Sequence, residues 1–265
     1  MKTSLYETHL NLRAKMTEFA GWEMPLYYSG INDEVAAVRK TAGIFDLSHM
    51  GEFYAYGDQG LSLLQSVVTN DVSRIEVGQA QYNLLCNESG GVLDDLIIYR
   101  LDTDLYMPVV NASNTASDFA WMQAHNRSTT ALENKSADTG LIAIQGPAAA
   151  AVLQQLVDFG LAEMKRFHIR QGSIRGKNTW VASTGYTGGP GYELYCDTAD
   201  AAVLWDALID AGQAFGAKPA GLGARDVLRV EAGYPLYGHE LSTETTPLDA
   251  GLMWAVKLAK SSFVG

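Results

Sequence analysis

This sequence of 265 residues has few cysteines and no long apolar run. Its two cysteines, Cys86 and Cys196, are far apart and show neither metal nor redox spacing, so we expect two buried, reduced thiols. Because no window is apolar for long enough to span a bilayer, the sequence predicts no membrane association. Residues 1–9 have no apolar signal core, which favours a cytoplasmic protein.

The sequence also lacks an excess of positive charge. A formal net charge of -11 argues against nucleic acid as a partner, because phosphate binding requires a basic surface. One stretch is locally basic, and we interpret it as a solvated strand face, with docking of an acidic partner as the less favoured alternative: Lys165, Arg166, His168, Arg170, Arg175 and Lys177.

Several catalytic motifs are missing as well. There is no zinc-type histidine pair, no Gly-x-Ser-x-Gly elbow and no Walker loop, and the pattern predicts no metal site. The histidines are scattered, and His49 is interpreted as a hydrogen-bonded structural residue.

What is present is the pattern of a globular protein that mixes hairpins with helices. Apolar residues make up 47% and charged residues 18%, enough for one large domain or two smaller ones. The sequence predicts an α+β fold with mostly antiparallel sheets and packed helices, in which two similar lobes form one unit over residues 1–265. Strands are expected at 80–86, 92–101, 105–111, 141–144, 179–184 and 192–196, and helices at 33–42, 61–68, 115–125, 200–215, 224–232 and after Pro147.

The most informative segment is GGVLDDLIIY, residues 90–99, which places two carboxylates inside an apolar strand. Alternation puts Asp94 on the face of Val92, Leu96 and Ile98, and Asp95 on the opposite face. Burying an ionised carboxylate is costly, so such a pair is either held by structural partners or tuned for acid–base chemistry. Both faces are apolar, and the alternation therefore does not distinguish the two acids.

A second candidate is the glycine-rich loop from Gly185 to Gly191. Glycine permits close backbone approach, but such a loop can also be only a wide turn. Tyr186 and Glu193 flank the loop, and an aromatic ring with a carboxylate suits a planar heterocycle that offers adjacent N–H donors.

The segment GLGARD, residues 221–226, superficially matches a dinucleotide fingerprint. It lacks the third glycine and the strand–turn–helix setting, so we interpret it as a tight turn into a helix. Arg225 and Arg229 then lie on one helix face, where like charges repel, and at least one of them should have an acidic or ligand partner. An intramolecular salt bridge is the simpler alternative for either arginine.

Taken together, seven segments closely resemble the T-protein family of the glycine cleavage system, the tetrahydrofolate-dependent aminomethyltransferases. They occur in the family's order along essentially the whole chain: FAGWEMPLYY (19–28), FDLSHMGE (45–52), GGVLDDL (90–96), IQGP (144–147), TGYTG (184–188), PAGLGARD (219–226) and PLDAGL (247–252).

The resemblance implies a transferase that takes an aminomethyl group from the lipoyl arm of the H-protein. It passes the one-carbon unit to tetrahydrofolate, its co-substrate, and releases ammonia, giving 5,10-methylenetetrahydrofolate. By motif position it implies that Asp95 is the catalytic acid and that Glu193 holds the pterin ring. It also implies pocket positions at Met50, Tyr82, Asn111, Tyr186 and Arg225.

The chain departs from the family pattern at its C-terminal end. It stops at Gly265, where the family continues into a small β-barrel domain, and we expect that domain to be absent. Two alternatives remain: a folate-dependent demethylase-type domain, which usually follows a flavin domain, and a folate-binding relative without transfer activity. The second carries a cysteine motif where this chain has YPLYGHE (234–240).

Overall fold

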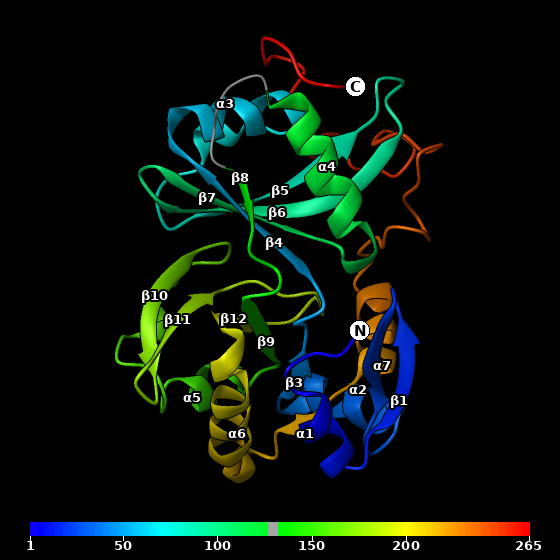
Figure 1. Cartoon of the computed structure of the whole chain (residues 1–265). Helices are drawn as coiled ribbons and strands as arrows, with labels where there is room; N and C mark the ends of the chain where they lie inside the picture. The colour runs from blue at the N-terminus through cyan, green and yellow to red at the C-terminus, as the bar shows by residue number, and fades with distance from the viewer. Residues whose placement is uncertain (127–131) are drawn as a thin grey trace. The chain divides into compact units, whose positions relative to one another are not determined.

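The computed structural model describes residues 1–126 and 132–265, and these fall into two compact units, each built from two stretches of the chain (Figure 1). Unit 1 comprises Met1–His49 and Ala137–Tyr234, and unit 2 comprises Met50–Ser136 and Pro235–Gly265. The chain therefore passes between the units three times, at positions that no linker-like composition marks in the sequence.

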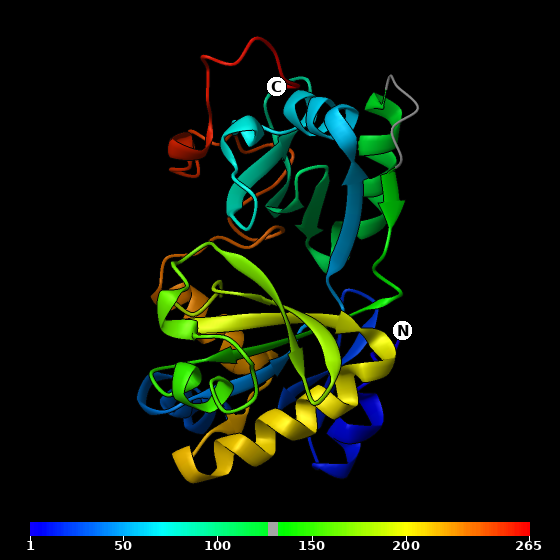
Figure 2. The same ribbon diagram turned by 90° about the vertical axis from the view of Figure 1, so that its left-hand side faces the viewer.

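Unit 1 is centred on a six-stranded sheet of order β10-β11-β12-β9-β3-β13. The strands are β3 (Gly43–Asp46), β9 (Thr139–Gln145), β10 (Ile169–Ile174), β11 (Lys177–Ala182), β12 (Gly191–Asp197) and β13 (Lys218–Pro219). Helices α5 (Ala149–Leu153) and α6 (Ala201–Gly212) cover one face, where α6 crosses the strands (Figure 2). The apolar side of α6 supplies Leu204 and Leu208 to a core shared with Ile142, Ile144 and Leu194, as amphipathic spacing predicts.

The rest of unit 1 packs around a buried carboxylate. It contains α1 (Tyr6–Asn11), the hairpin of β1 (Lys15–Phe19) and β2 (Trp22–Tyr27), α2 (Ile31–Lys40) and α7 (Leu222–Glu231). Glu34 on α2 accepts backbone N–H groups from Tyr28 and Ser29 at 2.6 and 2.9 Å, and from Gly221 at 2.9 Å. One side chain thus joins the start of α2 to the start of α7 and satisfies amides that would otherwise be buried without partners.

Unit 2 has a five-stranded sheet of order β5-β6-β7-β4-β8. The strands are β4 (Gly51–Tyr56), β5 (Ala80–Cys86), β6 (Val92–Asp102), β7 (Leu105–Val110) and β8 (Leu132–Asn134). Helices α3 (Gly57–Val67) and α4 (Thr115–His125) cover one face, in a core that includes Phe53, Leu64, Leu96, Ile98 and Met122. On the other side, Leu84, Cys86 and Val92 pack with Leu241 and Leu252 of the C-terminal segment, residues 235–265.

The two units share one topology. Unit 2 runs β4-α3-β5-β6-β7-α4 with sheet order β5-β6-β7-β4, and unit 1 runs β9-α5-β10-β11-β12-α6 with sheet order β10-β11-β12-β9. All neighbouring strands in these two sets are antiparallel. The predicted α+β class with antiparallel sheets is therefore confirmed. Short 3-10 turns complete the chain: Val72–Arg74, Ala112–Asn114, Leu161–Glu163, Thr198–Asp200, Gln213–Phe215 and Met253–Ala255.

The expected elements are present, with differences at their ends. The hairpin of β5 and β6 and the helix α4 lie where the sequence predicts them. Helix α2 begins at Ile31 after Gly30, two residues before the start that the sequence predicts. Helix α5 begins at Ala149, two residues after Pro147. Residues 213–215 tighten into a 3-10 turn, which ends the predicted 200–215 helix early.

One predicted side-chain direction is wrong. The pairing shifts between Leu85 and Cys86, with Leu85 opposite Asp94 and Cys86 opposite Val92, so Leu93 forms a bulge. A bulge reverses the alternation, and Val92 packs with Leu84 and Cys86 instead of sharing the face of Leu96. Both cysteines are buried free thiols, as predicted. Among residues 1–126 and 132–265, every helix falls short of the length and apolar character that a membrane crossing requires.

Candidate active site

The two acids of β6 lie in different surroundings. Asp94 is fully buried on the side of α4, whereas Asp95 is half-buried and opposite Leu84, on the side of the sheet that packs with the C-terminal segment. Tertiary structure thus separates two residues that the apolar alternation left equivalent.

Two neighbouring strands hold the carboxylate of Asp95. The hydroxyl of Tyr82 on β5 donates to its Oδ2 at 3.0 Å, and the amide of Asn111, directly after β7, donates to its Oδ1 at 2.9 Å. Burial and the negative charge of Asp94 raise the pKa of Asp95 to about 7, although the bonds from Tyr82 and Asn111 oppose this rise. Asp95 can therefore take up or release a proton near neutral pH, which general acid–base catalysis requires.

Asp94 is bonded inside the protein. The backbone N–H and the side-chain amide of Asn111 donate to it at 3.0 and 2.8 Å, and the side chain of Asn114 donates at 2.8 Å. It also shares a hydrogen bond with Asp118 on α4, a second acid that is 2% exposed. Sequence reasoning missed Asn114 and Asp118. The signal for Asp118 was a carboxylate four residues before the buried Met122, on the apolar side of a predicted helix.

An aromatic pair lies beside these acids. The rings of Tyr82 and Trp254 stack with centroids 5.2 Å apart and an interplanar angle of 28°. Trp254 is 57% exposed and was not predicted from the sequence. Met50, the remaining predicted residue of unit 2, is half-buried and directly precedes Gly51, which pairs with Val110 next to Asn111.

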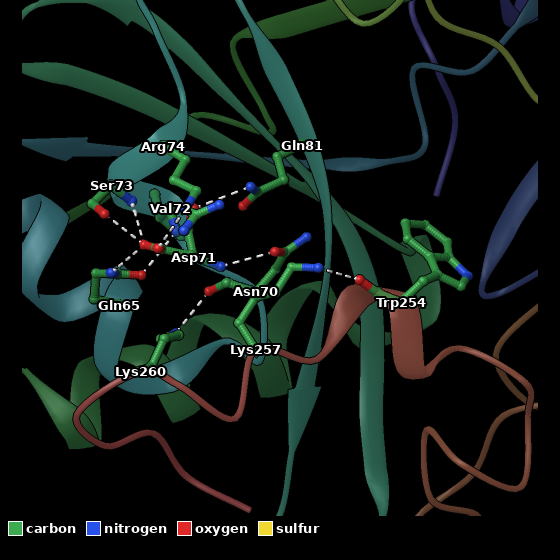
Figure 3. Close-up of polar contacts among 10 residues, drawn as sticks. All are labelled: Gln65, Asn70, Asp71, Val72, Ser73, Arg74, Gln81, Trp254, Lys257 and Lys260. Carbon is green, nitrogen blue, oxygen red and sulfur yellow. Dashed lines mark hydrogen bonds and ion pairs between the residues drawn. The ribbon is translucent and has the colours of Figure 1, made fainter.

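The turn that carries Trp254 is anchored by polar contacts (Figure 3). The ammonium of Lys260 donates to the carbonyls of Val68 and Asn70 at 2.6 and 2.7 Å, and Lys257 donates to the carbonyl of Trp254 at 2.7 Å. Burial lowers the pKa of Lys260 to about 8. The hydroxyl of Thr69 also donates to the carbonyl of Ala255 at 2.9 Å.

The other predicted residues lie in unit 1. Glu193 is on β12, and the hydroxyl of Thr184 donates to its Oε2 at 2.5 Å. The glycine-rich loop closes around Gln145, whose amide donates to the carbonyl of Thr184 at 3.1 Å and whose oxygen accepts from Thr187 at 3.2 Å. A Cβ at Gly185 or Gly191 would lie within 2.0 or 2.4 Å of this buried amide. Close packing against Gln145 therefore requires glycine at both positions. The turn that they permit leads into β12, which carries Glu193.

Tyr186 and Arg225 contact each other. The guanidinium of Arg225 lies over the Tyr186 ring, 4.6 Å from its centroid, and Tyr234 lies 5.7 Å away on a tilted plane. Arg229, one turn further along α7, bonds to Asp226 at 2.9 Å. Arg229 therefore has the expected acidic partner, and Arg225 makes a cation–π contact.

Two weaker candidates have structural roles. The N–H of Gly221 is bonded to Glu34, and a Cβ there would lie 2.4 Å from the carbonyl of Leu26, so packing explains the turn before α7. His49 is buried edge-on against Phe19, with ring centroids 5.6 Å apart, but its Nδ1 has no hydrogen-bond partner among the described residues, so the expected hydrogen bond is not found at that atom. Burial lowers its pKa to about 4, and this histidine is neutral at physiological pH.

A carboxylate that titrates near neutrality, oriented by an amide and a phenol, is typical of an enzyme that transfers a proton during reaction. Comparisons with known proteins define the class of enzyme more narrowly. Residues 5–260 match the model of the GCVT N-terminal domain family. The chain is 47% identical to the aminomethyltransferase of Thermotoga maritima and 48% identical to that of Geobacillus thermodenitrificans. Each alignment covers all of this chain, and 72% and 73% of the respective relatives.

The structural comparison agrees. The crystal structure of the glycine cleavage system aminomethyltransferase T from Bartonella henselae superposes with a TM-score of 0.92 at 35% identity, over all of this chain and 72% of that chain. The chain belongs to the GCVT N-terminal domain family. The predicted class, an aminomethyltransferase of the glycine cleavage type, is confirmed.

Proposed function

We propose that the protein transfers the one-carbon unit of an aminomethyl group, carried on the lipoyl arm of the H-protein, to tetrahydrofolate; the amino group leaves as ammonia, and the reduced lipoyl thiol stays on the H-protein. The class of enzyme is given by the family. Tetrahydrofolate as the acceptor and the H-protein as the donor are what the motifs add to that class.

The observation that carries the proposal is the setting of Asp95. Attack of a folate nitrogen on the aminomethyl carbon requires a group that orients the amine and takes its proton. A half-buried carboxylate with a pKa of about 7, fixed by Tyr82 at 3.0 Å and Asn111 at 2.9 Å, suits that task. We assign Asp95 as the catalytic residue, with Tyr82 and Asn111 as the groups that orient it.

The residues proposed to bind folate have matching chemistry. A reduced pterin presents neighbouring ring N–H and amino donors, which a carboxylate accepts as two parallel hydrogen bonds. Glu193 is such a carboxylate, oriented by Thr184. Tyr186 and Arg225 offer an aromatic face and a cation, and Met50 and Tyr82 offer surfaces for flat rings. A cation suits the carboxylates of the folate tail.

The test of Asp95 is an ammonia-release assay with aminomethylated H-protein and tetrahydrofolate. We expect Asp95→Asn to lower turnover at least about 100-fold, the lower range for a general acid–base group, while folate affinity stays within threefold. Asp102→Asn, an exposed carboxylate on the same strand, is the matched control and should be active. Turnover of Asp95→Asn close to that of the parent would overturn the assignment.

Folate recognition is tested separately by calorimetric titration of the protein with tetrahydrofolate. Glu193→Ala should weaken the affinity at least about tenfold, which corresponds to about 1.4 kcal/mol. Glu163→Ala, in an exposed 3-10 turn of the same unit, should leave it unchanged. Folate binding without ammonia release by the parent protein would instead favour a binding relative that lacks transfer activity.

A further inference from the structure

A third buried acid joins the pair on β6. Asp118, on α4, is 2% exposed, and its Oδ2 has no hydrogen-bond partner among residues 1–126 and 132–265. Its other contact is the hydrogen bond that it shares with Asp94, which is fully buried. Two carboxylates can share a hydrogen bond only when one of them carries the proton.

The remaining partners decide which acid is protonated. Asp94 accepts three N–H donors, two from Asn111 and one from Asn114, at 2.8–3.0 Å. Hydrogen bonds of this kind stabilise the ionised form. Asp118 has no such donors in the described part of the chain, and burial together with the charge of Asp94 raises its pKa far above the usual range. The proton therefore belongs to Asp118 and the negative charge to Asp94.

This arrangement connects Asp118 to Asp95 through Asn111. The same side-chain amide donates to Asp94 at 2.8 Å and to Asp95 at 2.9 Å. An ionised Asp94 fixes that amide, and its charge also raises the pKa of Asp95. The other titratable side chains that face these acids are Tyr82 from β5 and Tyr237 from the C-terminal segment. Both are phenols that stay neutral at pH 7.

We infer that Asp118 is a positioning residue for Asp95: as a protonated donor it holds Asp94 in its ionised form, and Asp94 in turn fixes the Asn111 amide that donates to Asp95. The inference rests on the proposed role of Asp95 and adds Asp118 and Asp94, which that proposal does not include. Asp118 itself needs no contact with substrate.

The first measurement is independent of catalysis. Carboxyl carbon shifts of ¹³C-labelled aspartate in the free protein should show Asp118 protonated at pH 7, with Asp94 ionised. An Asp118 that is ionised at pH 7 would overturn the inference, whatever the activity of the protein. Asp118→Asn, which is neutral and retains an N–H donor, should leave the titration of Asp95 where it is in the parent.

The second measurement removes the donor. In Asp118→Leu, Asp94 loses a partner that stabilises its charge, so the titration of Asp95 should move to lower pH, and the acid limb of the turnover profile should move with it. Met122→Ala, which removes apolar packing from the same helix, should lower stability without moving either. An Asp95 titration that is unmoved in Asp118→Leu, or moved equally in Asp118→Asn, would contradict the inference. A moved titration with an unmoved activity limb would support the link between the acids and argue against Asp95 as the catalytic group.

Discussion

Tyr82 contacts Asp95 through its hydroxyl and Trp254 through its ring. The hydroxyl donates to the carboxylate at 3.0 Å, and the ring stacks on the indole at 5.2 Å. One side chain of β5 therefore couples the candidate catalytic acid to the C-terminal segment. A change at either end of this contact should be measurable in the behaviour of Asp95.

Tyr82→Phe keeps the ring and removes the hydroxyl. Because the bond from Tyr82 lowers the pKa of Asp95, its loss should raise that pKa above about 7 and move the acid limb of the turnover profile to higher pH. A hydrogen bond to a charged group contributes about 1.5–3 kcal/mol, so turnover at pH 7 should fall roughly tenfold or more and recover in part at pH 9. A uniform loss at every pH would mean that the hydroxyl does not tune Asp95.

Lys260→Met should loosen the turn that carries Trp254. The variant keeps an apolar stem but loses the two bonds to the carbonyls of Val68 and Asn70, at a cost of about 1–3 kcal/mol. Hydrogen exchange of residues 253–264 should therefore be faster than in the parent. Lys257→Met, which removes an exposed bond within the same turn, is the control and should have the smaller effect. Equal exchange in both variants would contradict the anchoring role.

Glu52→Gln tests an uncompensated buried acid. Glu52 on β4 is fully buried, neither carboxyl oxygen has a hydrogen-bond partner among the described residues, and burial raises its pKa well above the usual range. Glu52 is buried at least cost when it is protonated. Its contribution to the free energy of unfolding is therefore fully present below about pH 4, the pKa in the unfolded chain, and is lost as the pH rises towards the pKa in the folded protein.

The difference in unfolding free energy between Glu52→Gln and the parent should therefore shift in favour of the variant as the pH rises. The shift should not exceed about 1.4 kcal/mol per pH unit. Urea unfolding at pH 5 and pH 8 measures it. Glu133→Gln on β8, whose side chain is 46% exposed, should show no such dependence. A Glu52→Gln curve parallel to that of the parent at both pH values would exclude the protonated state.

His9→Leu should destabilise unit 1. His9 is buried between Asp46, at 2.9 Å from its Nε2, and the hydroxyl of Tyr28, at 2.9 Å from its Nδ1. Without His9 the buried carboxylate of Asp46 loses one hydrogen-bond partner and keeps Thr3 and Ser48, at a cost of about 1–3 kcal/mol. His9→Gln offers both a donor and an acceptor and should lose less. Thermal unfolding of the two variants distinguishes this electrostatic cost from simple loss of volume, which would affect both alike.

The hairpin of β5 and β6 and the helix α4 could be predicted because their signals are local. Alternating apolar residues around a glycine-rich turn define a hairpin, and apolar residues at helical spacing define α4. The strands β3 and β4 were not predicted. Both are short, and they pair with β9 and β7, which lie far along the chain, so no local period marks them.

The candidate site, too, could be predicted only in part from the sequence. Asp94 and Asp95 stand out in the sequence because two carboxylates interrupt an apolar strand. The bonds to them come from Tyr82, Asn111 and Asp118, in three other parts of the chain. The bulge at Leu93 also changes the face of Val92, which strict alternation does not predict.

The sequence by itself determined the class of fold and the family, and it supplied the residues proposed for the site. Side-chain type and local spacing are properties of the chain alone. Tertiary structure decided which acid is buried and which is half-buried, how the chain divides into two units of the same topology, and which groups surround each acid. Burial and hydrogen bonding set a carboxyl pKa, and both depend on groups that only folding brings together.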